Sequence, residues 1–214
     1  MLGPIFSLIK QLREVGESIV GIRRATAEPA HTVEQMIDGI EIRRYGTRIA
    51  AQTTITADEE AARNAGFRRL AGYIFGDNHA AAKIAMTAPV AQQAGGKRGE
   101  KIAMTAPVAQ EAVADNEWVI RFFMPADKTL ESLPQPNNPA VQLLIVPEEI
   151  VAVRRFSGSR SPSTVASQTA MLMTTLREKG VEPAGTPVAW FYDPPWTVPM
   201  LRRNEIAVRV NLQS

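Results

Sequence analysis

The sequence predicts an α+β fold built from two successive strand-helix-strand-strand units. Apolar residues first alternate with a period of two over residues 33–56, then recur at helical spacing over 58–75, and alternate again over 118–124. The same order returns over residues 150–212. Two such units can pair their sheets about a pseudo-twofold axis, which leaves a cleft or open barrel lined by both. Because no low-complexity linker separates the halves, we expect one domain.

An amphipathic pattern precedes this body. Its apolar residues recur at spacings of four and three, and they are Met1, Ile5, Leu8, Leu12, Val15, Ile19 and Ile22. We therefore expect a helix and connector over residues 1–30, followed by a ligand-binding domain over 31–214. Docking on the body, self-association and contact with a membrane surface through residues 1–24 all remain open for this helix. Charges recur from Lys10 onward, so we predict neither a membrane span nor a cleaved signal, and we expect a cytoplasmic protein.

The first unit is expected to contain a helix over residues 58–75. Thr56 and Glu59 have the spacing of a capping box, and Gly76 is suited to end the helix. The expected strands of this unit are 40–42, 49–55 and 118–124. The apolar stripe of the helix is Phe67, Leu70 and Ile74.

The second unit repeats this arrangement around a helix over residues 162–179. Ser161 is a favourable N-cap, Pro162 suits the first helical position, and Gly180 ends the pattern. The expected strands are 150–156, 188–192 and 206–212.

A ten-residue block, KIAMTAPVAQ, occurs at 83–92 and again at 101–110. The intervening residues contain glycines and charges typical of a turn. We therefore predict an antiparallel hairpin whose arms are the two copies, each with a proline that favours an edge or a bulge. Alternatively, one or both Met-Thr-Ala-Pro turns shape the rim of a pocket.

Composition excludes several classes of function. Twenty-four basic and twenty-two acidic residues leave a net charge of only +2, so we expect no nucleic-acid partner. The absence of cysteine excludes thiolate zinc sites and cysteine nucleophiles, and His31 and His79 are too far apart for a local metal pair. No phosphate loop, serine elbow or metalloprotease motif is present, so we predict no catalytic residue.

Several blocks together carry a more specific signal. They are IEIRRYG (40–46), AGFRRLAGYIFGDN (65–78), KIAMTAPV, RFFMP (121–125), VAVRRFSG (151–158) and YDPPWTVPMLRRNEI (192–206). In this combination the chain resembles the SOUL family of haem-binding proteins over residues 33–210. The resemblance implies a distorted antiparallel β-barrel flanked by two helices, built from a duplicated β-α-β-β unit, as in gyrase-inhibitor-like effector-binding domains.

The resemblance also implies a ligand surface formed by the first helix and the loop at 192–203. Carried over to this sequence, its candidate residues are Arg44, Phe67, Arg69, Leu70, Tyr73, Ile74, Trp196 and Met200. An apolar stripe is more often core than ligand surface, so we expect Tyr73 and Arg69 to be its exposed neighbours. Arg44 stands where some members have a histidine proposed to bind iron, so it cannot be a ligand but could pair with a propionate. The metal ligand stays open, and His79 is expected to be a solvated loop residue.

Two functions follow from these residues. The first is non-enzymatic, weakly ligated binding of haem or another tetrapyrrole for buffering or transfer, with arginines contacting the propionates. The alternative is a small-molecule effector-binding module or a hydrolase of the related fold, which would need a carboxylate in its cleft. The candidate carboxylates are Glu41, Asp193 and Glu205.

Overall fold

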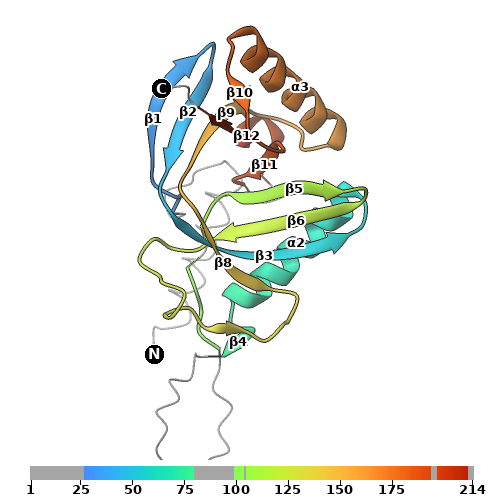
Figure 1. The fold of residues 1–214 in the computed structure, drawn as a ribbon. Helices are drawn as coiled ribbons and strands as arrows, with labels where there is room; N and C mark the ends of the chain where they lie inside the picture. Colours follow the sequence, from blue (N-terminus) through green and yellow to red (C-terminus); the bar gives the residue numbers. More distant parts are fainter. Residues whose placement is uncertain (1–26, 80–98, 104, 194–196, 212–214) are drawn as a thin grey trace, which may run out of the picture.

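A strongly curled antiparallel sheet, with two helices packed against it, forms the core of the computed structural model (Figure 1). The structure describes residues 27–79, 99–103, 105–193 and 197–211. The strands of the large sheet are β1 (His31–Ile37), β2 (Ile40–Tyr45), β3 (Arg48–Thr56), β5 (Val108–Ala114), β6 (Glu117–Phe123), β8 (Gln142–Val146), β9 (Glu149–Phe156), β10 (Glu182–Pro183), β11 (Val188–Phe191) and β12 (Asn204–Asn211). A small second sheet pairs β4 (Asn78–His79) with β7 (Gln135–Pro136). The predicted N-terminal helix, the first arm of the predicted hairpin and Trp196 lie outside the described residues.

The strand order confirms the predicted duplication. Along the sheet the strands run β1-β2-β9-β12-β11-β5-β6-β3-β8, so β9-β12-β11 in one half mirrors β3-β6-β5 in the other. The halves meet where β11 pairs with β5. In each half, the strand that comes before the set of three in sequence pairs with the other half. Strand β2, which precedes β3, pairs with β9, and β8, which precedes β9, pairs with β3. The two units are therefore interleaved in one sheet.

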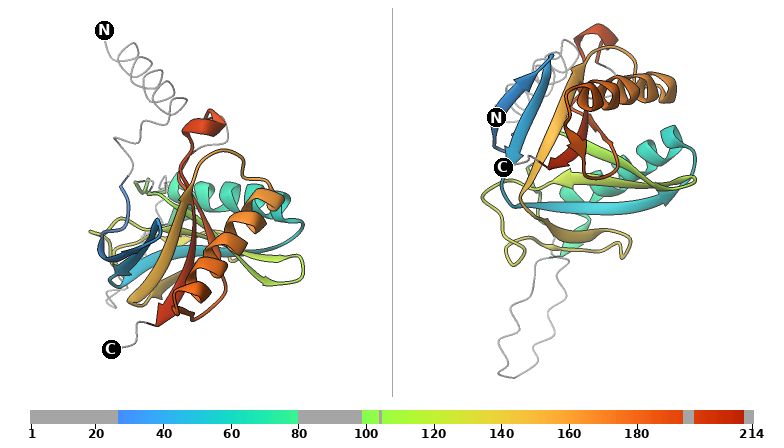
Figure 2. Two further views of the ribbon diagram at one scale, coloured as in Figure 1. Left: turned by 90° about the horizontal axis from the view of Figure 1, so that it is seen from above. Right: turned by 45° about the horizontal axis from the view of Figure 1, so that its top comes forward.

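Both predicted helices are confirmed to within one residue at each end. They are α2 (Glu59–Ile74) and α3 (Pro162–Glu178), and each covers one half of the sheet (Figure 2). Ser161 caps α3 as predicted. The predicted capping box at α2 is wrong, because the side chain of Asp58 accepts the bond from the backbone N–H of Ala61 at 2.9 Å. Aspartate two residues later satisfies the same unpaired donors and adds a favourable charge at the helix N-terminus.

Apolar side chains fill both faces of the curled sheet. On the helix side, Leu172 of α3 packs with Ile206, and Leu70 of α2 packs with Ile120. On the other face a separate cluster fills the interior of the curl, and it contains Tyr45, Phe123, Val151, Trp190, Tyr192 and Ala207. Since successive residues of a strand point to opposite faces, β11 contributes to both clusters.

A close contact between α2 and β6 predicts that alanine destabilises the protein at one helical glycine, although alanine usually stabilises a helix relative to glycine. A Cβ added at Gly66 would lie 2.4 Å from Cγ1 and 2.8 Å from Cβ of Ile120. Overpacking of this kind costs about 1–3 kcal/mol, which exceeds the ~1 kcal/mol that alanine gains over glycine inside a helix. Gly66→Ala should therefore lower the free energy of unfolding in urea. Gly72→Ala on the same helix, where the nearest atom is 3.9 Å away, is the matched control and should raise it by up to about 1 kcal/mol; equal effects of the two variants would contradict this packing.

Candidate functional site

The apolar stripe of α2 belongs to the core. Leu70, Tyr73 and Ile74 are at most 1% exposed, and half-buried Phe67 packs edge-on against Phe122 at 5.4 Å between ring centroids. The expectation that Tyr73 is exposed is wrong: its hydroxyl donates to the carbonyl of Pro134 at 2.9 Å, and burial raises its pKa to about 12. The segment around Leu133 packs over this side of the helix, so two faces of α2 are buried rather than one.

The two candidate arginines are engaged elsewhere on the sheet. Arg69 donates to the hydroxyl of Thr53 at 2.7 Å. Arg44, on β2, pairs with Glu34 of β1 at 2.8 Å and with Glu148 at 3.2 Å. These contacts do not bring Arg44 or Arg69 to the loop between β11 and β12.

That loop exposes apolar side chains at a turn of 3₁₀-helix, η1 (Pro199–Leu201). Val198 is 37% exposed, Met200 76% and Leu201 44%. The backbone N–H of Gly158 donates to the carbonyl of Pro199 at 2.9 Å, so the loop lies beside the connection from β9 to α3. Met200 therefore lies on an exposed apolar surface.

Arginines from both halves of the chain gather next to this loop. The guanidinium carbons of Arg63, on α2, and Arg160, before α3, lie 5.1 Å and 5.6 Å from the ring centroid of Phe191. Arg160 also donates to the carbonyl of Asp193 at 3.1 Å, and Arg202 donates through Nε to the carbonyl of Thr197 at 2.8 Å. We call Arg63, Arg160 and Arg202 the arginine cluster.

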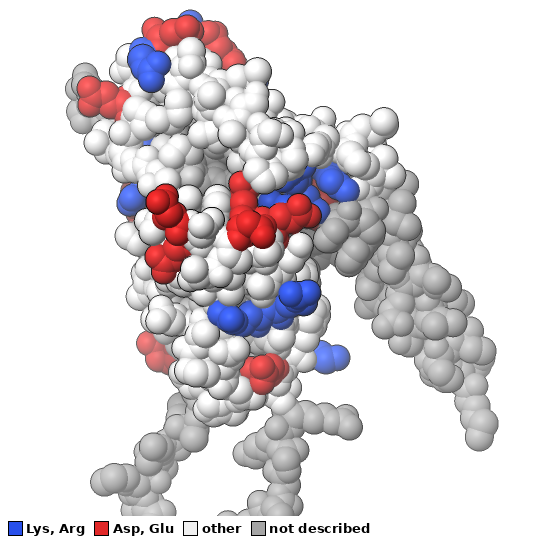
Figure 3. All heavy atoms as spheres, turned by 90° about the vertical axis from the view of Figure 1, so that its right-hand side faces the viewer, with Lys and Arg blue, Asp and Glu red and all other residues white. Residues whose placement is uncertain are grey.

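The arginine cluster carries closely spaced positive charge. Burial lowers the pKa of Arg160 to about 10, and repulsion by Arg202 and Arg63 adds to this effect, against a smaller opposing contribution from Asp193. Burial likewise lowers the pKa of Arg63, against opposing contributions from Glu59, which pairs with it at 3.8 Å, and from Glu60. On the face seen in Figure 3, basic and acidic side chains lie in small neighbouring groups. A bound anion would relieve the repulsion within the arginine cluster.

Sequence reasoning missed this cluster, although a signal was present. Arg63 precedes Phe67, Leu70 and Ile74 at spacings of four, three and four, so it extends the same stripe by one turn. Arg160 lies in the segment FSGSRSPS, whose serines and glycine are typical of a turn and a helix cap. Its proximity to α2 depends on how the second unit packs beside the first.

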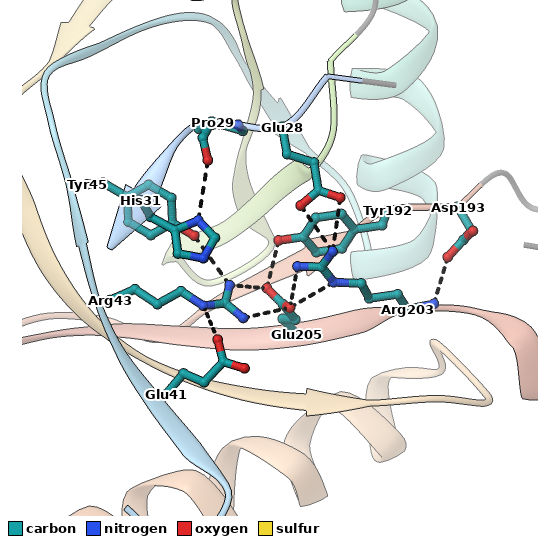
Figure 4. A network of polar contacts seen from close by, with 10 residues as sticks. All are labelled: Glu28, Pro29, His31, Glu41, Arg43, Tyr45, Tyr192, Asp193, Arg203 and Glu205. Carbon is teal, nitrogen blue, oxygen red and sulfur yellow. Dashed lines mark hydrogen bonds and ion pairs between the residues drawn. The ribbon is translucent and has the colours of Figure 1, made fainter. Parts of the chain in front are cut away.

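A buried ionic network anchors the start of β12 beside the loop (Figure 4). Glu205 is fully buried and accepts bonds from Arg43 at 2.8 and 3.1 Å and from the hydroxyl of Tyr192 at 2.7 Å. Arg203 pairs with Glu205 at 2.9 Å and with Glu28 at 2.9 Å. Burial alone would raise the pKa of Glu205, but the bonds and charge from Arg43, with Tyr192 and Arg203, lower it below its ordinary value.

The surroundings of the three candidate carboxylates differ from those of a catalytic carboxylate in a hydrolase. Glu205 is enclosed and ion-paired, and Asp193 accepts a bond from the backbone N–H of Arg203 at 2.6 Å. Glu41 is paired with Arg43 at 2.7 Å. In the described residues, each of the three carboxylates thus accepts a hydrogen bond from an arginine side chain or a backbone amide.

The described residues contain no group of three or more metal-binding side chains. His79 is exposed, as expected, but it lies in the short strand β4 rather than in a loop, and its ring lies 2.8 Å from the side-chain oxygen of Asn137. His31 contacts the carbonyl of Pro29 and packs against Tyr45. Among the helices of the described ranges, none has the length and apolar character required to cross a membrane.

The chain is similar in sequence and fold to several known proteins. A family model described as SOUL heme-binding protein matches residues 26–209. Heme-binding protein 2 of Mus musculus and that of Homo sapiens are each 30% identical over 141 residues, which is 65% of this chain and 62% of theirs. The match thus spans less than two thirds of these relatives. The C-terminal domain of EcmrR has a similar fold, with a TM-score of 0.58 at 10% identity over 81% of this chain and 98% of that domain.

Proposed function

The chain belongs to the SOUL heme-binding protein family, and on that premise we propose that it binds haem or a related tetrapyrrole without catalysis, for buffering or transfer. One observation supports the location of the ligand: the arginine cluster lies beside the exposed apolar loop at 198–201. A tetrapyrrole with propionates combines an apolar ring with carboxylates. The two surfaces match these two parts of the molecule.

In this proposal the ring lies against Val198, Met200 and Leu201, and the arginine cluster binds the propionates. Arginine suits this role because its planar guanidinium forms paired bonds with carboxylates. Phe67, Leu70, Tyr73 and Ile74 then support the site by holding α2 on the sheet. Trp196, in the same loop, stays a predicted contact.

Weak iron ligation remains part of the proposal. Haem would supply its iron and its absorbing ring when bound, while this chain supplies the apolar surface and the charges. The described part of the loop offers the thioether of Met200, a weak axial donor. Affinity should then come chiefly from buried apolar area, at roughly 25 cal/mol per Å².

A titration of haemin into the purified chain, followed by the Soret band, tests the site. Wild type should saturate near one equivalent. Arg160→Ala and Arg63→Ala should each raise the Kd by about tenfold, since each removes a charged hydrogen bond. Metal-free protoporphyrin should bind similarly, because the iron contributes little.

The matched control is Arg44→Ala, which removes an arginine whose ion pairs lie on β1 and beside β8. It should leave the haemin Kd unchanged. The dimethyl ester of protoporphyrin should bind all variants equally, because it lacks the carboxylates. If Arg44→Ala lost haemin binding while Arg160→Ala retained it, the ligand would lie elsewhere.

A further inference from the structure

A groove with mostly apolar walls lies next to β8, the strand that ends the order of the large sheet. Its volume is about 780 Å³. Ile145 of β8 is paired with Ile49 of β3 and is 56% exposed, and Leu130 adds a half-buried apolar side chain. The rest of the wall comes from the turn at 46–48, the loop at 124–131 and the segment at 27–30. We call this feature the edge groove.

An exposed apolar edge of this kind favours a cover. An edge strand carries unpaired backbone groups, and proteins commonly protect such strands with a helix or a loop. Burial of the exposed isoleucine would add to the gain. Within the described residues, the segments at 27–30 and 124–131 flank the edge groove but leave Ile145 exposed.

The amphipathic segment at 1–24 leads directly to the edge groove. Ala27 lines the groove, and its carbonyl accepts a hydrogen bond from the backbone N–H of Ala106 at 2.9 Å. The chain is therefore fixed beside the groove at this point. Ile22 precedes Ala27 by five residues, which span at most roughly 18 Å, so the last apolar residues of the segment can reach the groove.

The charge of the segment also matches that of the groove. Residues 1–24 contain four basic side chains, Lys10, Arg13, Arg23 and Arg24, and two acidic ones. Asp127 and Glu131 are exposed at the groove and form no ion pair within the described residues. The other charged residues of the groove are already paired: Glu28 with Arg203, Arg48 with Glu149 and Lys128 with Glu100. The unpaired charge at the groove is therefore acidic, and the segment is basic.

We propose that residues 15–24 dock in the edge groove of their own chain. Ile19 and Ile22 then contact the apolar wall formed by Ile49, Leu130 and Ile145, while Arg23 and Arg24 lie near Asp127 and Glu131. Docking covers the edge strand and gives the apolar stripe of the segment a partner within the molecule.

Thiol labelling of the full chain tests this proposal, because the sequence has no cysteine of its own. In buffer without lipid, Ile19→Cys should react with dithiobis(nitrobenzoate) at least about tenfold more slowly than Glu17→Cys, since a docked thiol reacts only after local opening. Glu17 is the matched control, because it lies opposite the apolar stripe in the expected helix.

A change in the groove should remove this protection. Ile145→Asp, combined with Ile19→Cys, should restore fast labelling, because docking would bury an unpaired carboxylate. Met36→Asp is the matched control: Met36 is 58% exposed on β1, outside the edge groove, so its replacement should leave labelling slow. If circular dichroism shows that Ile145→Asp is unfolded, Asp127→Lys with Glu131→Lys replaces it and should accelerate labelling severalfold at low ionic strength.

Three results would overturn the proposal. The first is equal labelling of Ile19→Cys and Glu17→Cys. The second is protection of Ile19→Cys that persists in a folded groove variant, which would mean that the segment is buried elsewhere. The third is protection that disappears when the protein is diluted, which would place the segment in the groove of a second copy.

Discussion

Replacing Glu205 by glutamine should lower the free energy of unfolding by about 3–5 kcal/mol, the range expected when one partner of a buried ion pair is removed. The substitution keeps the shape of the side chain but leaves Arg43 and Arg203 without their shared negative charge. Urea unfolding at neutral pH measures the effect. Glu111→Gln is the control, because its pair with Arg121 is partly exposed and should contribute less than about 1 kcal/mol.

The same variant should reveal a pH dependence. The pKa of Glu205 lies below its ordinary value of 4.5, so its stabilising contribution is complete above pH 4.5 and is lost as the pH falls through the lowered pKa. The difference in stability between wild type and Glu205→Gln should therefore shrink in acid. A difference that stays constant down to the acid unfolding transition would show that Glu205 is not the titrating group.

Replacing Tyr73 by alanine should cost about 3–5 kcal/mol, the range for removing a large aromatic from a core. The ring is 1% exposed and packs between α2 and the sheet. Tyr73→Phe should cost only about 1–3 kcal/mol, because it leaves the carbonyl of Pro134 without its donor. Thermal unfolding of the two variants compares these values.

Haemin binding separates a structural role of Tyr73 from a direct contact. Tyr73→Phe, measured at a temperature where it is fully folded, should bind haemin with the wild-type Kd. A large rise in Kd in this folded variant would mean that the hydroxyl reaches the ligand.

Local signals predicted the elements of this fold well. Ser161 and Pro162 mark the start of α3 as the structure has it, because caps and prolines act within a few residues. At the start of α2, Thr56 and Asp58 are both residue types that suit the cap, and the structure uses Asp58. The crossing of β2 and β8 between halves had no local signal, because strand pairing depends on contacts far apart in sequence.

The candidate site was less predictable for the same reason. The stripe of α2 correctly indicated a core face, but nothing near Tyr73 in sequence shows that residues 133–134 cover it. The spacing in sequence is enough to place Arg63 on the stripe. Its membership of the arginine cluster depends on Arg160, which comes 97 residues later. Clusters assembled from separate elements need the tertiary structure.

The interleaving of β2 and β8 restricts how the molecule can respond to a ligand. Proteins built from two separable lobes close around a ligand by rotation at a hinge. Here each half contributes a strand to the other, so rotation would break the sheet at β2–β9 and β3–β8. Arg63 from one half and Arg160 from the other are thus held at a set separation before any ligand arrives. Such preorganisation reduces the ordering cost of binding, so discrimination among ligands should depend on how well their charge spacing matches this separation.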